Sequence, residues 1–223
     1  MRRRPPTRVG LLLTLALVAA VPPPSAAAPP APPSREEALA GLGSRDVTAR
    51  RQAAAWLGDV GTMADAAALL GALRDPDEVV RALAEHSVWQ VWGRSGDADV
   101  DALFQTGLEH MNRRDAQAAI DTFTDVIRRK PEFAEGWNKR ATVYFLVGEY
   151  ARSLADCDEV MKRNPSHFGA LAGYGQIYLQ LDQPERALQY FERALDVNPN
   201  LSGVEAAARQ LRRLLIERRK GTI

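Results

Sequence analysis

A period of 34 residues constrains the fold of this chain more than any other feature of its sequence. Pro131, Pro165 and Pro199 stand at that interval, and columns of small and large residues repeat in step with them. The first set of columns is Leu103, Trp137 and Leu171, then Gly107, Ala141 and Gly175, then His110, Tyr144 and Tyr178. The second set is Ala119, Ser153 and Ala187, then Phe123, Cys157 and Phe191, then Val126, Val160 and Ala194. Self-similarity at a fixed period of this size indicates stacked structural repeats.

The spacing inside each set predicts the secondary structure. Successive columns are separated by four and then three residues, which places their members on one stripe of an α-helix. Each repeat is therefore expected to contain two helices. The small residue lets a neighbouring helix approach closely, the large residue fills the remaining space, and the proline ends the second helix. The predicted unit is an antiparallel helix pair.

These residues also resemble a known family. The middle unit is similar to the tetratricopeptide repeat (TPR) through Trp137, Ala141, Tyr144, Gly148, Tyr150 and Pro165, and the third unit matches at Ala187, Phe191, Ala194 and Pro199. The departures from the pattern are His110, Ser153, Cys157, Asp182 and Pro184. The resemblance implies an all-α fold, a right-handed α-α superhelix (solenoid), with repeats at 100–133, 134–167 and 168–201. Residues 202–220, apolar on one side and rich in arginine on the other, are predicted to form the capping helix.

A shorter period precedes the repeats. Four residues recur 31 positions later in the chain: Asp46, Arg50, Ala53 and Leu57 reappear as Asp77, Arg81, Ala84 and Val88. Residues 34–94 resemble HEAT-like helical repeats of the short bacterial type, in which an acidic residue opens the helix and satisfies its free N–H groups. A joint is expected at 94–99, which is rich in Ser, Gly and Asp.

The first 28 residues have the pattern of a secretory signal peptide. Four arginines precede the apolar run from Val9 to Val21, and small residues follow it at 25–28. This run of 13 residues is too short to span a bilayer of ~30 Å, so no integral membrane span is expected in the mature form. An uncleaved anchor is the alternative. Residues 29–33 are a Pro/Ala-rich leader. The pattern predicts export, to the periplasm or as a secreted protein.

Composition and motifs exclude several classes of function. The net charge of +1 gives no clustered basic excess, so no nucleic-acid partner is expected. The single cysteine, Cys157, excludes an intramolecular disulfide, and the three histidines lie far apart without metal-ligand spacing. No nucleophile, phosphate-binding or metalloprotease motif occurs. The sequence therefore predicts no enzyme, no cofactor and no metal.

Single residues have simple structural interpretations. Cys157 lies on a predicted inward stripe and is interpreted as a small buried hydrophobe. His86 and His110 are expected to be packed, whereas His167 is expected to be a solvated loop residue. The three tryptophans of the first segment, Trp56, Trp89 and Trp92, are interpreted as packing residues in preference to a sugar-binding platform.

The family resemblance also implies a partner-binding groove. A second stripe on the first helix of each repeat would line the concave face, and it consists of Phe104, Leu108, Met111, Asn138, Thr142, Phe145, Ala172, Gln176 and Leu179. Its apolar walls and its amides and hydroxyl suit an extended or helical peptide. In the family, the clamp for a C-terminal carboxylate uses Lys, Asn and Arg, whereas this chain has Phe104, Leu108, Gly169 and Gly173 at most of those positions and only Lys139 is basic, so chaperone tails are disfavoured. One alternative stays open, that the HEAT-like helices cover the wall made by repeat 1.

The predicted function is a non-catalytic protein–protein interaction adaptor of the bacterial cell envelope, with a protein or peptide partner of unknown identity. Two alternatives are retained. One is a structural scaffold that assembles into homo-oligomers through Phe104 or the C-terminal helix. The other is an accessory subunit of a cell-wall enzyme. Fold analogy by itself supports binding and does not identify the partner.

Overall fold

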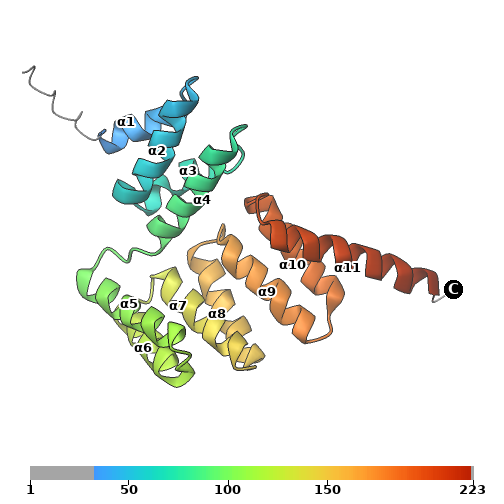
Figure 1. Cartoon of the computed structure of the whole chain (residues 1–223). Helices are drawn as coiled ribbons and strands as arrows, with labels where there is room; N and C mark the ends of the chain where they lie inside the picture. Colours follow the sequence, from blue (N-terminus) through green and yellow to red (C-terminus); the bar gives the residue numbers. More distant parts are fainter. Residues whose placement is uncertain (1–32, 222–223) are drawn as a thin grey trace, which may run out of the picture. The chain divides into compact units, whose positions relative to one another are not determined.

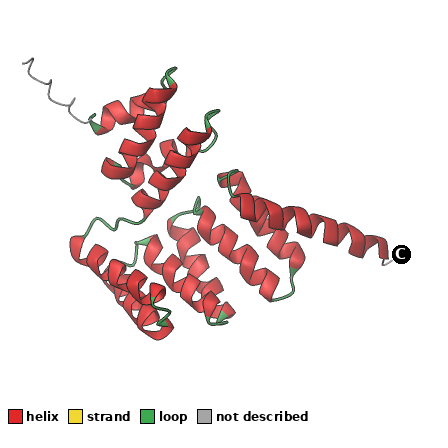
Figure 2. Ribbon diagram, viewed as in Figure 1, coloured by secondary structure: helices red, strands yellow, loops and turns green. Residues whose placement is uncertain are grey.

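The computed structural model describes residues 33–221, and it consists of helices and loops throughout this range (Figure 2). The predicted signal peptide and nearly all of the Pro/Ala-rich leader lie outside the described residues. Eleven α-helices and one 3-10 turn occur between residues 33 and 221, without a strand in that range. The all-α prediction is confirmed. Of the helices in this range, none is both long enough and apolar enough to cross a bilayer.

The first group of helices occupies the predicted HEAT-like segment (Figure 1). It comprises α1 (Arg35–Gly41), α2 (Val47–Val60), the 3-10 turn η1 (Met63–Asp65), α3 (Ala66–Ala72) and α4 (Glu78–Trp92). Helices α2 and α4 pack against each other along their length. Leu57, Leu69, Val80 and Val88, all inaccessible to solvent, fill the core between these helices.

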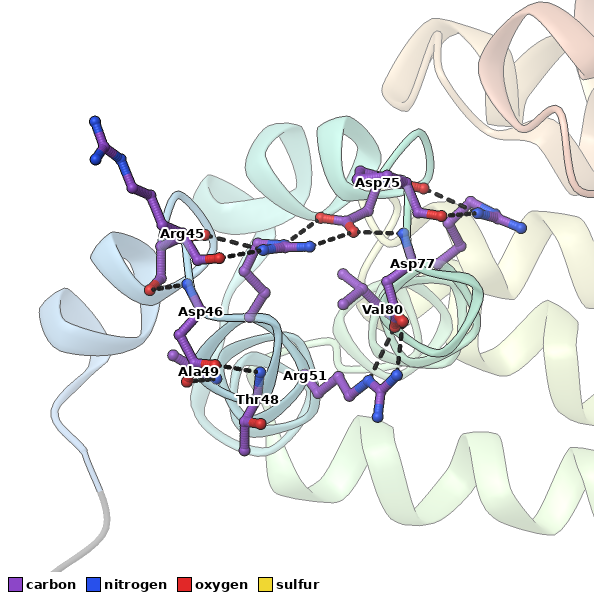
Figure 3. Close-up of polar contacts among 12 residues, drawn as sticks. Arg45, Asp46, Thr48, Ala49, Arg51, Asp75, Asp77 and Val80 are labelled. Carbon is purple, nitrogen blue, oxygen red and sulfur yellow. Dashed lines mark hydrogen bonds and ion pairs between the residues drawn. The ribbon is translucent and has the colours of Figure 1, made fainter.

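The loops that open α2 and α4 share one geometry. Asp46 caps α2 and accepts from the backbone N–H groups of its first turn, and Asp77 does the same for α4 (Figure 3). The N–H of Asp46 donates to the Ser44 hydroxyl, and the N–H of Asp77 donates to the Asp75 carboxylate. Capping of this kind is what the recurring aspartate predicts.

Arginines repeat the same pattern and tie the two loops together. Arg50 donates to the carbonyl oxygens five and six residues before it, and Arg81 does so in the next loop. Arg50 also reaches the Asp75 carboxylate at 2.7 Å, while Arg51 reaches Asp77 at 2.6 Å (Figure 3). The shared loop geometry supports a 31-residue internal repeat, and the HEAT-like assignment of 34–94 is retained as a proposal.

The second group contains three helix pairs and one long terminal helix. The pairs are α5 (Ala98–Asn112) with α6 (Ala116–Arg129), α7 (Ala134–Leu146) with α8 (Tyr150–Arg163), and α9 (Phe168–Gln180) with α10 (Pro184–Val197). Helix α11 (Ser202–Gly221) follows and packs on α10. Each of the three spaced prolines lies in a turn after the second helix of its pair. Helix α5 begins at Ala98, before the predicted start of repeat 1 at residue 100. The repeat limits given above therefore remain predictions.

The columns of small and large residues meet as the spacing predicts. A Cβ added to Gly107 would lie 2.5 Å from the ring of Phe123, and one added to Gly175 would overlap the ring of Phe191. In the middle pair, the Ser153 hydroxyl donates to a carbonyl oxygen of α7 at 2.7 Å. The turn inside each pair needs a left-handed residue, and positions 114, 148 and 182 all have positive φ. Only the middle one is a glycine.

The first group of helices packs on the loops that close the second and third pairs. Phe168, at the start of α9, belongs to the hydrophobic core of the first group, together with Leu201 after α10. Arg81 donates to the Asn200 side chain at 3.0 Å, and Asn200 donates to the Leu73 carbonyl at 2.8 Å. Residues 33–221 belong to one compact unit, so the N-terminal helices are part of the same fold as the repeats.

Candidate partner-binding groove

A depression of 210 Å³ lies between α7 and α9, the first helices of the second and third pairs. Five of the nine predicted groove residues line it, namely Asn138, Thr142, Phe145, Ala172 and Gln176. Its floor contains Ala141, Gly169 and Gly173, and a Cβ added to Gly173 would make an ordinary contact, 3.9 Å from the Cys157 sulfur. Small residues on the facing helices therefore keep this space open.

The polar groups of this depression are fewer than the sequence suggests. Gln176 is exposed, and its amide has no hydrogen-bond partner within residues 33–221. The Thr142 hydroxyl donates to the carbonyl of Asn138 at 2.9 Å and keeps its acceptor capacity. The Asn138 amide, in contrast, is nearly buried and donates to Glu135 at 3.0 Å. Gln176 and Thr142 are therefore the main groups available to a bound backbone.

Phe104 and Leu108 face a different depression, of 430 Å³, together with Trp89, Gln90 and other residues at the end of α4. Phe104 is only 3% exposed and packs against Phe123 and Phe133, with ring centroids 5.7 and 5.2 Å apart. Its ring fills the core of the first pair. The end of α4 thus lies beside the wall made by repeat 1.

The two remaining predicted residues lie at opposite ends of the stripe. Met111 is partly buried against the core of the first pair. Leu179, which is 38% exposed, lines a depression of 700 Å³ shared with Leu211, Leu214 and Arg213 of α11. The nine residues therefore do not form one continuous channel, and the part between α7 and α9 is the portion that brings most of them together.

A buried polar cluster lies beside the groove, and no pattern in the sequence predicts it. His167 is expected to be a solvated loop residue, but its side chain is fully inaccessible. Its Nδ1 accepts the N–H of Ala170 at 3.0 Å, so it caps α9 and Nε2 carries the proton donated to Glu135. The ring stacks on Trp92 at 4.5 Å. The expectation is wrong because helix α4 covers the loop in which His167 lies.

Glu135 is the acidic member of this cluster. Burial raises the pKa of its carboxyl, but the contacts with His167, Lys139 and Asn138 outweigh burial and hold that pKa at about 2. The Lys139 ammonium lies 3.4 Å from the carboxylate and 5.5 Å from the ring centroid of Trp89. The one basic residue expected at the family's carboxylate clamp is thus already paired.

Cys157 and the tryptophans have the structural roles expected of them. Burial, with the nearby Asp156 and Asp158 carboxylates, raises the pKa of the Cys157 thiol to about 12, which favours the thiol over the reactive thiolate. Trp89 and Trp92 pack on Phe168, with centroids 5.1 and 5.0 Å from its ring. Within the described range, no three His, Cys, Asp or Glu side chains gather in a way that could hold a metal ion.

Comparisons with known proteins identify the repeats. Family models described as tetratricopeptide repeat match residues 104–160 and 144–215. A TPR repeat-containing protein of Rhizobium etli is 35% identical over 126 residues, 56% of this chain and 61% of the relative. The outer membrane protein assembly factor BamD of Caulobacter vibrioides is 28% identical over 118 residues, 51% of this chain and 35% of that protein. The chain thus spans less than two thirds of each of these relatives.

A solved structure shows the same fold. The first TPR of Spaghetti (RPAP3), bound to the HSP90 peptide SRMEEVD, superposes with a TM-score of 0.51 at 24% identity, covering 54% of this chain and 96% of that one. Its identity to this chain is low enough that the likeness shows the fold alone. Together with the family models, it supports the predicted solenoid of helix pairs.

Proposed function

Because the chain belongs to the tetratricopeptide repeat family, we propose that it is a non-catalytic adaptor that binds a peptide or helix of a partner protein between α7 and α9. The observation that carries the proposal is the open groove lined by Ala141, Gly173 and Gln176, whose side-chain amide has no hydrogen-bond partner among residues 33–221. A solved relative of the same fold holds a peptide, which supports this use of the fold.

The lining of the groove indicates the chemistry of the partner segment. None of the residues around the 210 Å³ depression carries a charge. Its walls include Phe145 and Ile177, and Gln176 and Thr142 can pair with backbone N–H and C=O groups. The segment that fits is therefore neutral, with small apolar side chains, in contrast to the acidic peptide of the RPAP3 structure.

The proposed location is the cell envelope. The support is the pattern of residues 1–28 and the similarity to an outer membrane assembly factor over half of this chain. Expression of the full chain in a bacterium, followed by fractionation and N-terminal sequencing of the mature protein, tests it. Export with cleavage after Ala26 or Ala28 is expected, whereas a cytoplasmic product that retains its first residues contradicts the proposal.

Photo-crosslinking tests the groove directly. A photoreactive amino acid replaces Gln176 in the groove or, as a matched control, the exposed Gln117 on α6. The probe at 176 is expected to yield a crosslinked partner that the probe at 117 does not. Gly173→Leu, which fills the groove, should abolish this product, while Gly71→Leu in α3, where a Cβ meets no atom within 4 Å, should retain it. Identical products from both probes, or a product that survives Gly173→Leu, contradicts the proposal.

Self-assembly is the second candidate, because the terminal helix exposes apolar side chains. Leu214 and Ile216 on α11 are both exposed, and Leu214 shares a 700 Å³ depression with Leu179. An apolar strip of this kind favours association. Static light scattering separates the candidates, since a mass that stays monomeric over a hundredfold range of concentration excludes the scaffold.

A further inference from the structure

Exposed apolar side chains gather at one edge of the repeats. Nine large hydrophobic side chains are exposed in the described part of the chain, and six of them lie in the C-terminal parts of α7, α9 and α11 or in the turns that follow. These six are Leu146, Val147, Leu179, Leu181, Leu214 and Ile216. The three helices begin 34 residues apart, and because each pair is antiparallel they run in the same direction. Their C-terminal ends therefore lie at the same edge.

Two side-chain contacts show that these ends are neighbours. The Tyr150 hydroxyl, at the start of α8, donates to the Gln180 side chain at the end of α9, at 3.5 Å. The Arg218 guanidinium of α11 lies 4.0 Å from the Asp182 carboxylate in the turn after α9. We call the surface made by residues 146–152, 179–186 and 213–221 the turn edge. It is separate from the groove, because none of the residues that line the 210 Å³ depression belongs to it.

The apolar side chains of the turn edge project outwards at its tips. Leu146 is 69% exposed, and neither it nor Val147 lines any of the three depressions described above. A protein surface would need a matching hollow for each projecting side chain, since the core of a protein interface is closely packed. A lipid surface admits such side chains without a preformed hollow.

Helix α11 extends the turn edge beyond the other helices. It has 20 residues, against 13 in α9, so its last turns extend further by about 10 Å at ~1.5 Å per residue (Figure 1). Ala208 and Leu211 are buried, but further along the helix Leu214 is exposed and Ile216 is 53% exposed. The end of α11 is therefore an apolar and basic helix without a cover in the described part of the chain.

The charge of α11 is opposite to that of the rest of the molecule. Residues 202–221 contain six basic and two acidic residues, whereas residues 33–201 contain 19 basic and 26 acidic residues. The helix is thus positive by four charges and the remainder is negative by seven. Within the turn edge there are six basic and four acidic residues. An anionic surface therefore attracts this edge and repels the rest of the molecule, which orients the molecule on that surface.

We propose that the turn edge binds the surface of an anionic lipid bilayer, with its apolar side chains among the headgroups and the cations of α11 beside the anionic lipids. A basic helix with exposed apolar residues is typical of binding to a membrane surface. Apolar insertion and charge attraction reinforce each other, since one signal alone gives only marginal binding. A second copy fits the edge less well, because α11 against α11 would bring two groups of four positive charges together.

A fluorescent probe tests which part of the protein meets the lipid. The chain that starts at Pro29 is used, because the basic and apolar residues of 1–28 would bind lipid themselves and residues 33–221 belong to one compact unit. An environment-sensitive dye is attached to a cysteine introduced as Ile216→Cys or, as a matched control, as Met63→Cys, and both native side chains are about half exposed. The native thiol, Cys157, is buried, so the introduced cysteine is labelled selectively.

Vesicles of phosphatidylcholine with and without phosphatidylglycerol are titrated into each labelled protein. With the anionic vesicles, the emission of the dye at 216 is expected to move to shorter wavelength, while that of the dye at 63 stays unchanged. Arg213→Gln combined with Lys220→Gln should weaken binding about 25-fold, at about fivefold for each charge removed. The exposed pair Arg128→Gln and Arg129→Gln, at the end of α6 and hence at the opposite edge, should bind like the wild type.

Several results would overturn the proposal. They are absence of binding to the anionic vesicles, equal binding to the neutral vesicles, an equal shift of the dye at 63, and full affinity of the α11 double variant. A shift of the dye at 216 that depends on protein concentration without vesicles identifies a contact between copies and also overturns it. Circular dichroism verifies that each variant is folded. The outcome is independent of the groove, because Gly173→Leu changes no residue of the turn edge and should leave lipid binding intact.

Discussion

The buried Glu135 carboxylate makes a strong prediction about stability at low pH. Its pKa in the folded protein is about 2, against an ordinary value of 4.5. Because folding lowers this pKa, the contribution is fully present above pH 4.5 and is lost as the pH falls towards 2. The difference between the two values corresponds to about 3 kcal/mol, at ~1.36 kcal/mol per pH unit. Since Glu135 is almost fully buried, solvent screening does not reduce this figure substantially.

The matched substitution is Glu135→Gln, which keeps the size of the side chain and removes its titration. Glutamine can still accept from His167, but its NH₂ group would face the donors of Asn138 and Lys139. The variant is therefore expected to be less stable at pH 7 by about 3 kcal/mol, the cost of a broken buried pair.

Urea unfolding followed by circular dichroism at pH values from 7 to 2 measures the effect. Other carboxyls with lowered pKa values, Asp65, Asp75 and Asp77, make both proteins less stable in acid. The informative quantity is the difference between wild type and variant, which should shrink from about 3 kcal/mol towards zero between pH 5 and pH 2. A difference that stays constant over this range would refute the assignment of Glu135 as a buried, ionised partner of His167.

Substitutions at two glycines distinguish the effect of overpacking on stability from the effect of backbone strain. Gly107→Ala places a Cβ 2.5 Å from the Phe123 ring and should destabilise the fold by about 1–3 kcal/mol through overpacking, offset by up to ~1 kcal/mol of helix propensity. Gly148→Ala should cost about 1–2 kcal/mol for a different reason, since Gly148 has a φ of 80° and no atom lies within 4 Å of an added Cβ. Thermal unfolding checks both against Gly203→Ala, which meets neither constraint; equal stability of all three variants would contradict both explanations.

The sequence correctly predicts the side-chain contacts that repeat with the 34-residue period. Gly107 meets Phe123, and the same pairing recurs at Gly175 and Phe191, because each repeat fills one helix stripe with the same sizes of side chain. The capping aspartates Asp46 and Asp77 were equally predictable, since a helix start needs an acceptor for its free N–H groups. Side-chain size within a helix pair and capping at a helix start depend on local sequence, so these predictions hold wherever the helices form.

The candidate site is predicted less well, because its details depend on contacts between distant segments. His167 is buried by Trp92, which lies 75 residues earlier and outside the repeats. The Asn138 amide is occupied by Glu135, a neighbour that no repeat column marks. The family resemblance places Phe104 on the stripe that lines the groove, but its ring packs against Phe133 in the loop after α6. Periodicity reports which face of a helix is apolar, but not which neighbour covers it.

These distant contacts also explain why the groove is built where it is. Trp89 of α4 stands against the first turn of α9, where it packs on Phe168, and its ring lies beneath the Lys139 ammonium of α7. The Glu135–His167 pair joins α7 and α9 a short distance away. Both walls of the 210 Å³ groove are therefore held at their N-terminal ends by one cluster, whereas the rim residues Thr142 and Gln176 lie on the exposed part of the same helices. A repeat array fixes the spacing of its helices through side-chain size, and here the N-terminal helices add a second constraint on that spacing.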